Sequence, residues 1–170
     1  MIRPLRALLL LTLPAMLVGC SPARSGPSAA SVSQAGAEAK AFLDKTAKAP
    51  GVVVTASGLQ YKVVASGPAS GPHPGPRDEV KLDYVGQLTN GQVFDSTLAR
   101  GTPAVLRVEE LVPAWQEALP LMRPGDEWIL YVPPALGYGE QGAGGAIPPN
   151  AVLIFKIKLL GVLPAGPARG

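Results

Sequence analysis

The segment that most restricts the possible folds is residues 151–160, where apolar and other side chains alternate directly after a loop rich in glycine and proline. From Leu153 to Leu159 every second residue is apolar, and two lysines stand between them. A period of two predicts a strand with one buried face. The preceding loop, 135–150, carries the aromatic Tyr138. Loops mounted on a rigid sheet are frequent sites of ligand contact, so this segment predicts a binding loop beside a half-buried strand.

Further short segments have the character of strands. They comprise residues 52–55, 59–64, 80–84 and 127–132. Between the third and fourth of these, Asn90 and Gly91 predict a hairpin turn, because both residue types tolerate a positive φ. Strands at such short intervals indicate an antiparallel sheet.

One helix is predicted within this set of strands. Leu111, Trp115, Ala118 and Met122 recur at helical spacing, and Pro124-Gly125 ends the pattern. The fold class that follows is α+β, with an antiparallel sheet wrapped around one short helix. A second short helix is expected before this domain, at residues 35–50, where apolar side chains share a face and Gly51 follows Pro50.

The N-terminus has the features of an export signal. Two arginines precede an apolar stretch that is too short to span a bilayer comfortably, and residues 1–19 are therefore predicted to be a signal peptide. Its end, Leu17-Val18-Gly19-Cys20, resembles the lipobox of bacterial lipoproteins, which implies lipidation of Cys20. The alternative is an ordinary signal peptide with an accidental cysteine. A lone cysteine cannot form an internal disulfide, which favours the lipid anchor.

The mature chain gives no sign of nucleic-acid binding. Removing residues 1–19 takes two of the 15 basic residues and none of the 12 acidic ones, leaving a net charge of +1, and no basic stripe with interleaved aromatics is present. Residues 20–34, the anchor and the Ser, Ala, Pro and Gly-rich stretch after it, predict a flexible tether. Residues 51–162 are the expected domain, and the Pro/Gly/Ala-rich residues 163–170 a disordered tail.

Four motifs in a fixed order resemble the FKBP family of macrolide-binding peptidyl-prolyl isomerases. They are residues 80–86, 90–97, 111–115 and 135–150, and the resemblance runs from about Gly58 to Val162. It implies an isomerase of X-Pro bonds that binds rapamycin- or tacrolimus-type macrolides and needs no cofactor or metal. Among bacterial relatives, the Mip-like branch forms dimers through a long N-terminal helical region. The short helix here implies a monomer.

The resemblance also implies a set of site residues. Phe94, Asp95 and Tyr138 are expected to be catalytic. The pocket lining is expected to comprise Tyr84, Phe94, Leu111, Val112, Trp115, Tyr138, Ile147 and Phe155. In the family pattern Trp115 is the floor under the proline ring, while the Tyr138 hydroxyl and the Ile147 backbone N–H donate hydrogen bonds to ligand carbonyls. Asp95 makes a polar contact beside the twisted amide.

Each of these positions also has a structural interpretation. Trp115 and Phe155 fit core periodicity without a ligand, Tyr84 and Phe94 fit a sheet, and Asp95 fits a turn cap. Tyr138 is different, because an aromatic residue in a glycine-rich loop has little reason to pack there. Three positions depart from the family pattern and leave the preferred residue before proline open: Ala104, Leu136 and Ala143.

Two other features are expected to be unrelated to function. Residues 137–142 satisfy G-x-G-x-x-G, but a dinucleotide site needs a following helix, and here Pro148-Pro149 and a strand follow. His73, the single histidine, lies in a Pro/Gly loop without cysteines or clustered carboxylates. A catalytic or metal-binding role is conceivable, but a solvated loop histidine is the favoured interpretation, and no metal site is predicted.

The sequence thus favours a lipid-anchored isomerase that assists the folding of exported proteins. Its expected place is the bacterial cell envelope, facing the periplasm or the surface, and Ser21 after the cysteine favours the outer membrane because aspartate there is associated with inner-membrane retention in enteric bacteria. The main alternative is a non-catalytic chaperone that binds proline-containing segments. A purely structural envelope lipoprotein is the third possibility.

Overall fold

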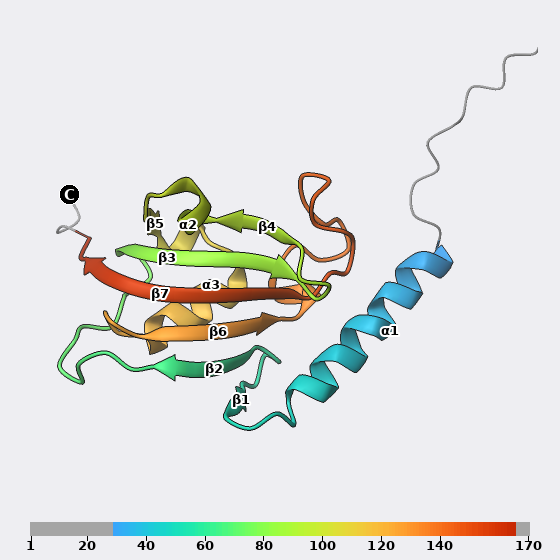
Figure 1. Ribbon diagram of the computed structural model, residues 1–170, viewed down its shortest axis with the longest axis horizontal. Coiled ribbons are helices and arrows are strands. Elements are labelled where there is room, and N and C mark those ends of the chain that lie inside the picture. Colours follow the sequence, from blue (N-terminus) through green and yellow to red (C-terminus); the bar gives the residue numbers. More distant parts are fainter. Residues whose placement is uncertain (1–28, 166–170) are drawn as a thin grey trace, which may run out of the picture.

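In the computed structural model of the protein, the placed and described residues are 29–165. Its centre is a seven-stranded sheet in the order β1-β2-β6-β7-β3-β4, with β5 paired to β3 beyond the end of β4 (Figure 1). Every strand pairing is antiparallel. The short helix α3 lies against one face of this sheet (Figure 1). The predicted α+β fold, a sheet around one short helix with a further helix before it, is confirmed.

The elements follow one another in the expected order. The strands are β1 (Val52–Val54), β2 (Gln60–Ala65), β3 (Glu79–Leu88), β4 (Val93–Ser96), β5 (Ala104–Arg107), β6 (Glu127–Val132) and β7 (Leu153–Leu163). The helices are α1 (Ala29–Thr46), α2 (Thr97–Arg100) and α3 (Pro113–Ala118), with single 3₁₀ turns η1 (Val108–Glu110), η2 (Leu119–Leu121) and η3 (Pro134–Leu136).

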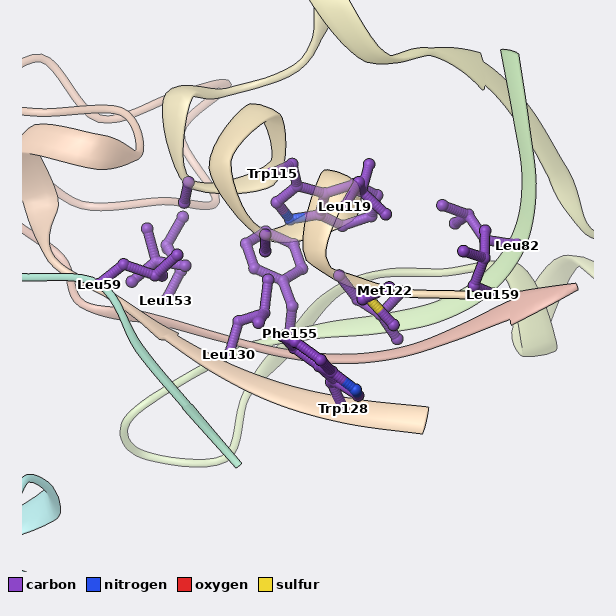
Figure 2. Close-up of a cluster of buried hydrophobic side chains, with 14 of the residues drawn as sticks. Leu59, Leu82, Trp115, Leu119, Met122, Trp128, Leu130, Leu153, Phe155 and Leu159 are labelled. Carbon is purple, nitrogen blue, oxygen red and sulfur yellow. The ribbon is translucent and has the colours of Figure 1, made fainter. Parts of the chain in front are cut away.

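The alternation in the sequence corresponds to the burial of the two central strands. Every second residue of β6 from Trp128 to Val132 is buried, and so is every second residue of β7 from Leu153 to Leu159. These side chains meet the buried face of α3 in one apolar core, part of which Figure 2 shows. Because the core residues come from strands and helix alike, neither element can bury its apolar face alone.

The hairpin between β3 and β4 is confirmed, but its turn differs from the expected one. Gly91 has φ +86°, whereas Asn90 does not adopt a positive φ. The Gly91 N–H donates to the Leu88 carbonyl, and the Leu88 N–H donates to the Gln92 carbonyl. This is a tight turn followed by a glycine in the left-handed conformation, a common three-residue hairpin connection.

Helix α3 is shorter than the sequence pattern predicts. It begins at Pro113 rather than Leu111, since proline suits the first helical position where no N–H partner is needed. It ends at Ala118, and the chain continues as η2, in which Pro120 cannot donate the hydrogen bond of an α-helix. Met122 therefore lies after the helix and η2, and its side chain is buried in the core from that position.

Helix α1 starts earlier than expected, at Ala29 instead of residue 35, so that part of the predicted tether is helical. Its C-terminal half is docked on the sheet. The Gln60 amide donates to the Leu43 carbonyl at 2.9 Å, and the Phe42 ring lies 6.4 Å from that of Tyr131. Ala39 is buried as well. Alanine and serine are compatible with helix, and these contacts stabilise the end nearest the domain.

The C-terminal end of the domain also lies further along the chain than the predicted residue 162. β7 continues to Leu163, and the Ala165 N–H donates to the Asp78 carboxylate at 2.8 Å. That bond and a second one from the Gly75 N–H lower the pKa of Asp78. The first residues of the predicted disordered tail are therefore held against the domain, and residues 166–170 lie outside the described range.

Within residues 29–165 no helix is long and apolar enough to cross a membrane. The predicted signal peptide, the lipidation site Cys20 and the first part of the tether lie outside the described residues.

Candidate functional site

Aromatic rings from four elements surround one cavity on the α3 side of the sheet. Tyr84 belongs to β3, Phe94 to β4, Trp115 to α3 and Phe155 to β7. The Trp115 ring meets those of Tyr84 and Phe155 edge to face, at centroid distances of 5.2 and 5.1 Å. Phe94 and Phe155 also meet edge to face, at 5.7 Å. These arrangements are favourable for aromatic pairs, so the rings form a rigid wall.

Trp115 and Phe155 form the floor of this cavity, and both are 4% exposed. Figure 2 shows the Trp115 ring, carried by the helix, next to the Phe155 ring from the sheet. The Trp115 Nε1 atom is itself buried and has no hydrogen-bond partner within the described residues. The part of the indole that faces the cavity is therefore carbon. Both residues belong to the apolar core and also line the cavity.

The cavity has a volume of about 260 Å³. Its lining comprises Tyr84, Phe94, Asp95, Leu106, Glu110, Leu111, Val112, Trp115, Tyr138 and Phe155. Other hollows of the described surface have similar volumes, between about 250 and 420 Å³. Volume alone does not single out this cavity. Its aromatic lining with a few convergent polar groups does, because that combination is typical of ligand sites.

A polar cluster lies at one side of the cavity. The Asp95 carboxylate accepts hydrogen bonds from the Tyr84 hydroxyl and from the Arg100 guanidinium. Arg100 also donates to the Tyr84 hydroxyl at 3.3 Å, and its guanidinium carbon lies 5.7 Å from the centre of the Tyr84 ring. Sequence analysis assigned no role to Arg100, since its contact with Asp95 exists only after α2 has formed.

These contacts determine the ionisation of the cluster. Partial burial opposes the ionisation of Asp95, but the hydrogen bonds from Tyr84 and Arg100 outweigh it, and the pKa of Asp95 is lowered. Burial and the hydrogen bond to Asp95 raise the pKa of Tyr84. At neutral pH this cluster therefore consists of the ionised Asp95 carboxylate, the Arg100 guanidinium and the neutral Tyr84 phenol.

Tyr138 lies at the rim, where it is 40% exposed. It follows η3 in the glycine-rich loop and lines the cavity, and within residues 29–165 its hydroxyl has no hydrogen-bond partner. A phenol in this position can donate to a ligand oxygen without giving up a bond inside the protein.

Ile147 is the one predicted lining residue that the structure places elsewhere. It is 7% exposed and packs in the core, and it is absent from the cavity lining. Its N–H donates to the Ala143 carbonyl, which closes a small antiparallel bridge across the loop. In this structure the donor is already used within the loop, so it is not available to a ligand, and the expected role of Ile147 in ligand binding stays a prediction.

A different amide is available at the cavity. Val112 is the N-cap of α3 and lines the cavity, and no hydrogen bond from its N–H occurs within the described residues. The segment before it is held by the Gln116 side chain, which donates to the carbonyls of Glu109 and Leu111 at 3.1 and 2.7 Å. The sequence predicted only that the Val112 side chain forms part of the apolar wall. It could not predict a free backbone N–H, because every residue type except proline has one.

Gly86 belongs to one of the sequence motifs, residues 80–86, but the sequence indicated no role for it. A Cβ atom there would lie 2.7 Å from the Phe94 ring and 2.9 Å from the Phe155 ring. Gly86 pairs with Asp95 on one side and Phe155 on the other. The absence of a side chain therefore allows both rings to lie over the sheet and form the cavity wall.

Of the two features expected to be unrelated to function, His73 lies outside the cavity lining, whereas residues 137–142 include the lining residue Tyr138. His73 accepts a hydrogen bond from Arg123 at Nε2, so Nδ1 carries the proton and donates to the Met122 carbonyl at 3.0 Å. His73 is exposed, as expected for a loop histidine, and these two hydrogen bonds tie its loop to the segment after η2. Residues 137–142 lead into the loop bridge and β7, with no helix in the described chain to receive a pyrophosphate. The described residues contain no group of three potential metal-ligating side chains.

Comparison with known proteins gives matches over most of the chain. The family described as "FKBP-type peptidyl-prolyl cis-trans isomerase" matches residues 71–160, and the family described as "Domain amino terminal to FKBP-type peptidyl-prolyl isomerase" matches residues 23–63. The second match covers α1 and β1 and extends into β2.

Individual relatives agree with these family matches. The chain is 50% identical over 125 residues to the peptidyl-prolyl cis-trans isomerase Mip of Coxiella burnetii, covering 74% of this chain and 54% of the relative. It is 47% identical over 126 residues to the outer membrane protein MIP of Legionella longbeachae, covering 74% and 53%. The crystal structure of FkpA from Escherichia coli aligns with a TM-score of 0.75 and 38% identity, covering 79% of this chain and 62% of that one. The chain thus spans about half the length of the two curated relatives.

Proposed function

Since the chain belongs to the FKBP-type peptidyl-prolyl cis-trans isomerase family, we propose that it catalyses the cis-trans isomerisation of X-Pro bonds in polypeptides. The observation that carries this proposal is the cavity itself, with its floor of Trp115 and Phe155 and the unpaired donors of Tyr138 and Val112 at its edge. The identity of the relatives supports it.

The geometry suits a reaction in which no covalent bond is broken. Rotation about the amide loses resonance, at a barrier of about 18–20 kcal/mol. An enzyme accelerates it by binding the twisted amide better than the planar one. Water favours the planar, dipolar amide, so an apolar cavity removes part of this preference. A proline ring over Trp115 would lie in such surroundings, with the polar cluster of Asp95 on one side.

The available donors would hold the peptide on both sides of the rotating bond. The Tyr138 hydroxyl and the Val112 N–H lie on different segments that line the cavity, and either can donate to a substrate carbonyl. Fixing the chain at two points leaves the rotation as the remaining freedom, which is the role of positioning groups in catalysis. The same apolar cavity would accept rapamycin- or tacrolimus-type macrolides as competitive inhibitors.

The substrates we propose are proline-containing segments of exported proteins, and the place of action is the cell envelope. Support for the envelope comes from the relative in Legionella longbeachae, whose name describes an outer membrane protein, and from the predicted signal peptide with Cys20 at its end. Lipidation of Cys20 would hold the protein at the membrane, with the outer membrane preferred, and the domain would act as a monomer.

A protease-coupled assay with a proline tetrapeptide tests the proposed activity. The purified protein should accelerate cis-to-trans conversion, and a stoichiometric amount of tacrolimus should abolish the acceleration. The matched control is Leu98→Ala, which removes an apolar side chain that is 66% exposed and outside the cavity, and it should leave the rate unchanged. A protein that binds the peptide but does not accelerate conversion would instead be the non-catalytic chaperone. Failure to bind either ligand would favour a structural lipoprotein.

A further inference from the structure

Strand β5, next to the cavity, has a free backbone edge. It pairs with β3 alone, with Ala104 opposite Leu82 and Arg107 opposite Glu79. The Val108 N–H donates to the Asp78 carbonyl, which continues this ladder. Because hydrogen-bonded and non-hydrogen-bonded pairs alternate in antiparallel sheets, the backbone of Leu106 faces β3 and that of Val105 faces away. Because β5 pairs with no strand other than β3 in the described chain, the outward-facing N–H and carbonyl of Val105 have no partner strand.

A hollow follows this edge and is continuous with the cavity. It has a volume of about 250 Å³ and is lined by Glu79, Val105, Leu106, Arg107, Glu110 and Leu111. Three of these residues, Leu106, Glu110 and Leu111, also line the cavity over Trp115. A ligand that leaves the cavity across Leu106 therefore arrives directly at the unpaired backbone of Val105.

The side chains along this hollow suit an extended polypeptide. Val105 is 51% exposed and offers an apolar contact. Around it lie three carboxylates, those of Glu79, Glu109 and Glu110, within 3.6–3.9 Å of the single Arg107 guanidinium. Exposed ion pairs of this kind contribute little to stability and can rearrange when a ligand arrives. Lys81 lies opposite Val105 in the ladder and adds a second basic side chain, so this edge has side chains of both charges and selects little by charge.

We propose that the substrate segment adjoining the bound proline adds to the free edge of β5 as an additional strand, through the Val105 N–H and carbonyl. The inference rests on the proposed isomerase function and names how the enzyme would hold a long substrate. Main-chain hydrogen bonds give affinity without demanding a sequence, which matches an enzyme for many unfolded polypeptides. The sheet has two other outer strands, β1 and β4. β1 has exposed valines but lies at the far end of the sheet from β3 and lines no part of the cavity. β4 contributes Phe94 and Asp95 to the cavity wall but lines no part of the hollow that leads away from it.

Two substitutions of Val105 distinguish the contribution of its backbone N–H from that of its side chain. Val105→Pro removes the outward N–H and leaves the ladder to β3 intact, since that ladder does not use this donor, and proline is tolerated on edge strands. Val105→Ala is the matched control, because it shortens the side chain and keeps the N–H. We expect Val105→Pro to lower kcat/KM about fivefold for an unfolded protein with rate-limiting proline isomerisation, while Val105→Ala changes it less than twofold. Both variants should retain the tetrapeptide activity of the unaltered protein.

A second measurement does not depend on the variants folding. Ten-residue proline peptides, each with one backbone amide N-methylated outside the X-Pro unit, are compared on the unaltered protein. Strand addition predicts that methylation at one or two alternate positions lowers kcat/KM about fivefold, whereas the others have no effect. Equal activity on every methylated peptide, or an equal loss in Val105→Pro and Val105→Ala, would overturn strand addition. Absence of turnover even on the tetrapeptide would instead contradict the proposed function.

Discussion

The Tyr84 hydroxyl donates a hydrogen bond to the Asp95 carboxylate across the wall of the cavity. Tyr84 is on β3 and Asp95 on the next strand, two rungs apart in the ladder that pairs Val85 with Ser96 and Gly86 with Asp95. Arg100 completes the arrangement from α2. The polar side of the cavity is therefore assembled by a hairpin and the first turn after it.

Replacing Asp95 by asparagine should reduce isomerase activity while preserving the fold. The substitution keeps the shape but removes the charge that Arg100 neutralises, and hydrogen bonds to charged groups contribute about 1.5–3 kcal/mol. We expect kcat/KM for the tetrapeptide to fall roughly tenfold or more, with an unchanged circular dichroism spectrum. If Asp95→Asn and Asp95→Ala both retained full activity, Asp95 would be a turn residue without a role in catalysis.

Introducing a methyl group at Gly86 should displace the aromatic rings that form the wall and floor of the cavity. The new Cβ would overlap the rings of Phe94 and Phe155, and overpacking of this kind costs about 1–3 kcal/mol. Gly86→Ala should therefore lower both the melting temperature and the affinity for tacrolimus. Gly161→Ala is the matched control, because it is also in a strand and its Cβ would meet nothing within 4 Å. Similar losses in both variants would show that a strand glycine matters for reasons other than the rings.

Truncation of Phe94 should weaken ligand binding more than folding. The side chain is half-buried and meets the Phe155 ring edge to face at the cavity. Phe94→Ala removes apolar wall from the site, so titration calorimetry with tacrolimus should show a loss of about tenfold or more in affinity. Val93→Ala, in which the truncated side chain is 52% exposed on the same strand, should bind normally. Unaltered binding by Phe94→Ala would assign this ring to the core alone.

The pH dependence of activity should be flat between about pH 5 and 9. The pKa of Asp95 is lowered from 3.8, so the stability it contributes is fully present above that value and is lost as the pH falls through the lowered pKa. The pKa of Tyr84 is raised from 10.0, so its contribution is present below that value and is lost only at higher pH. A kcat/KM profile checks this. An inflection near neutrality would show that a group outside the Tyr84–Asp95–Arg100 cluster controls the rate.

Membrane attachment and catalysis should be separable. Cys20→Ser should release a protein of unchanged specific activity into the soluble fraction, because the predicted anchor precedes α1 and the isomerase domain. Each buried CH₂ of an acyl chain contributes about 0.8 kcal/mol, so a multiply acylated terminus suffices to retain the domain. Mass spectrometry of the membrane form should find lipid on a chain that begins at Cys20. A mature terminus elsewhere would contradict the lipobox interpretation.

Much of the fold was predictable from local patterns. The alternation of apolar residues in β6 and β7 depends only on residues close together in the chain, and so does the glycine of the hairpin turn. Both features can therefore be recognised in a short stretch of sequence. Element boundaries were less predictable. The end of the domain shifted because Asp78 binds the backbone of Ala165, a contact between residues far apart in the chain. The start of α1 was missed because the alanine and serine residues before residue 35 show no periodic apolar pattern, although they are compatible with helix.

The sequence by itself determined the alternating strands and the class of fold, because side-chain type and spacing decide which faces are buried. Its resemblance to the FKBP family, rather than spacing, indicated most of the residues that line the cavity. Only the tertiary structure decided which polar groups remain available there. The Ile147 N–H is used by the loop bridge, while the Val112 N–H is free at the start of α3. Arg100 reaches Asp95 and Tyr84 because α2 places it there, and Gly86 leaves room for two rings that come from other strands. Hydrogen-bond occupancy and close approach depend on where distant segments meet, and residue type does not encode that position.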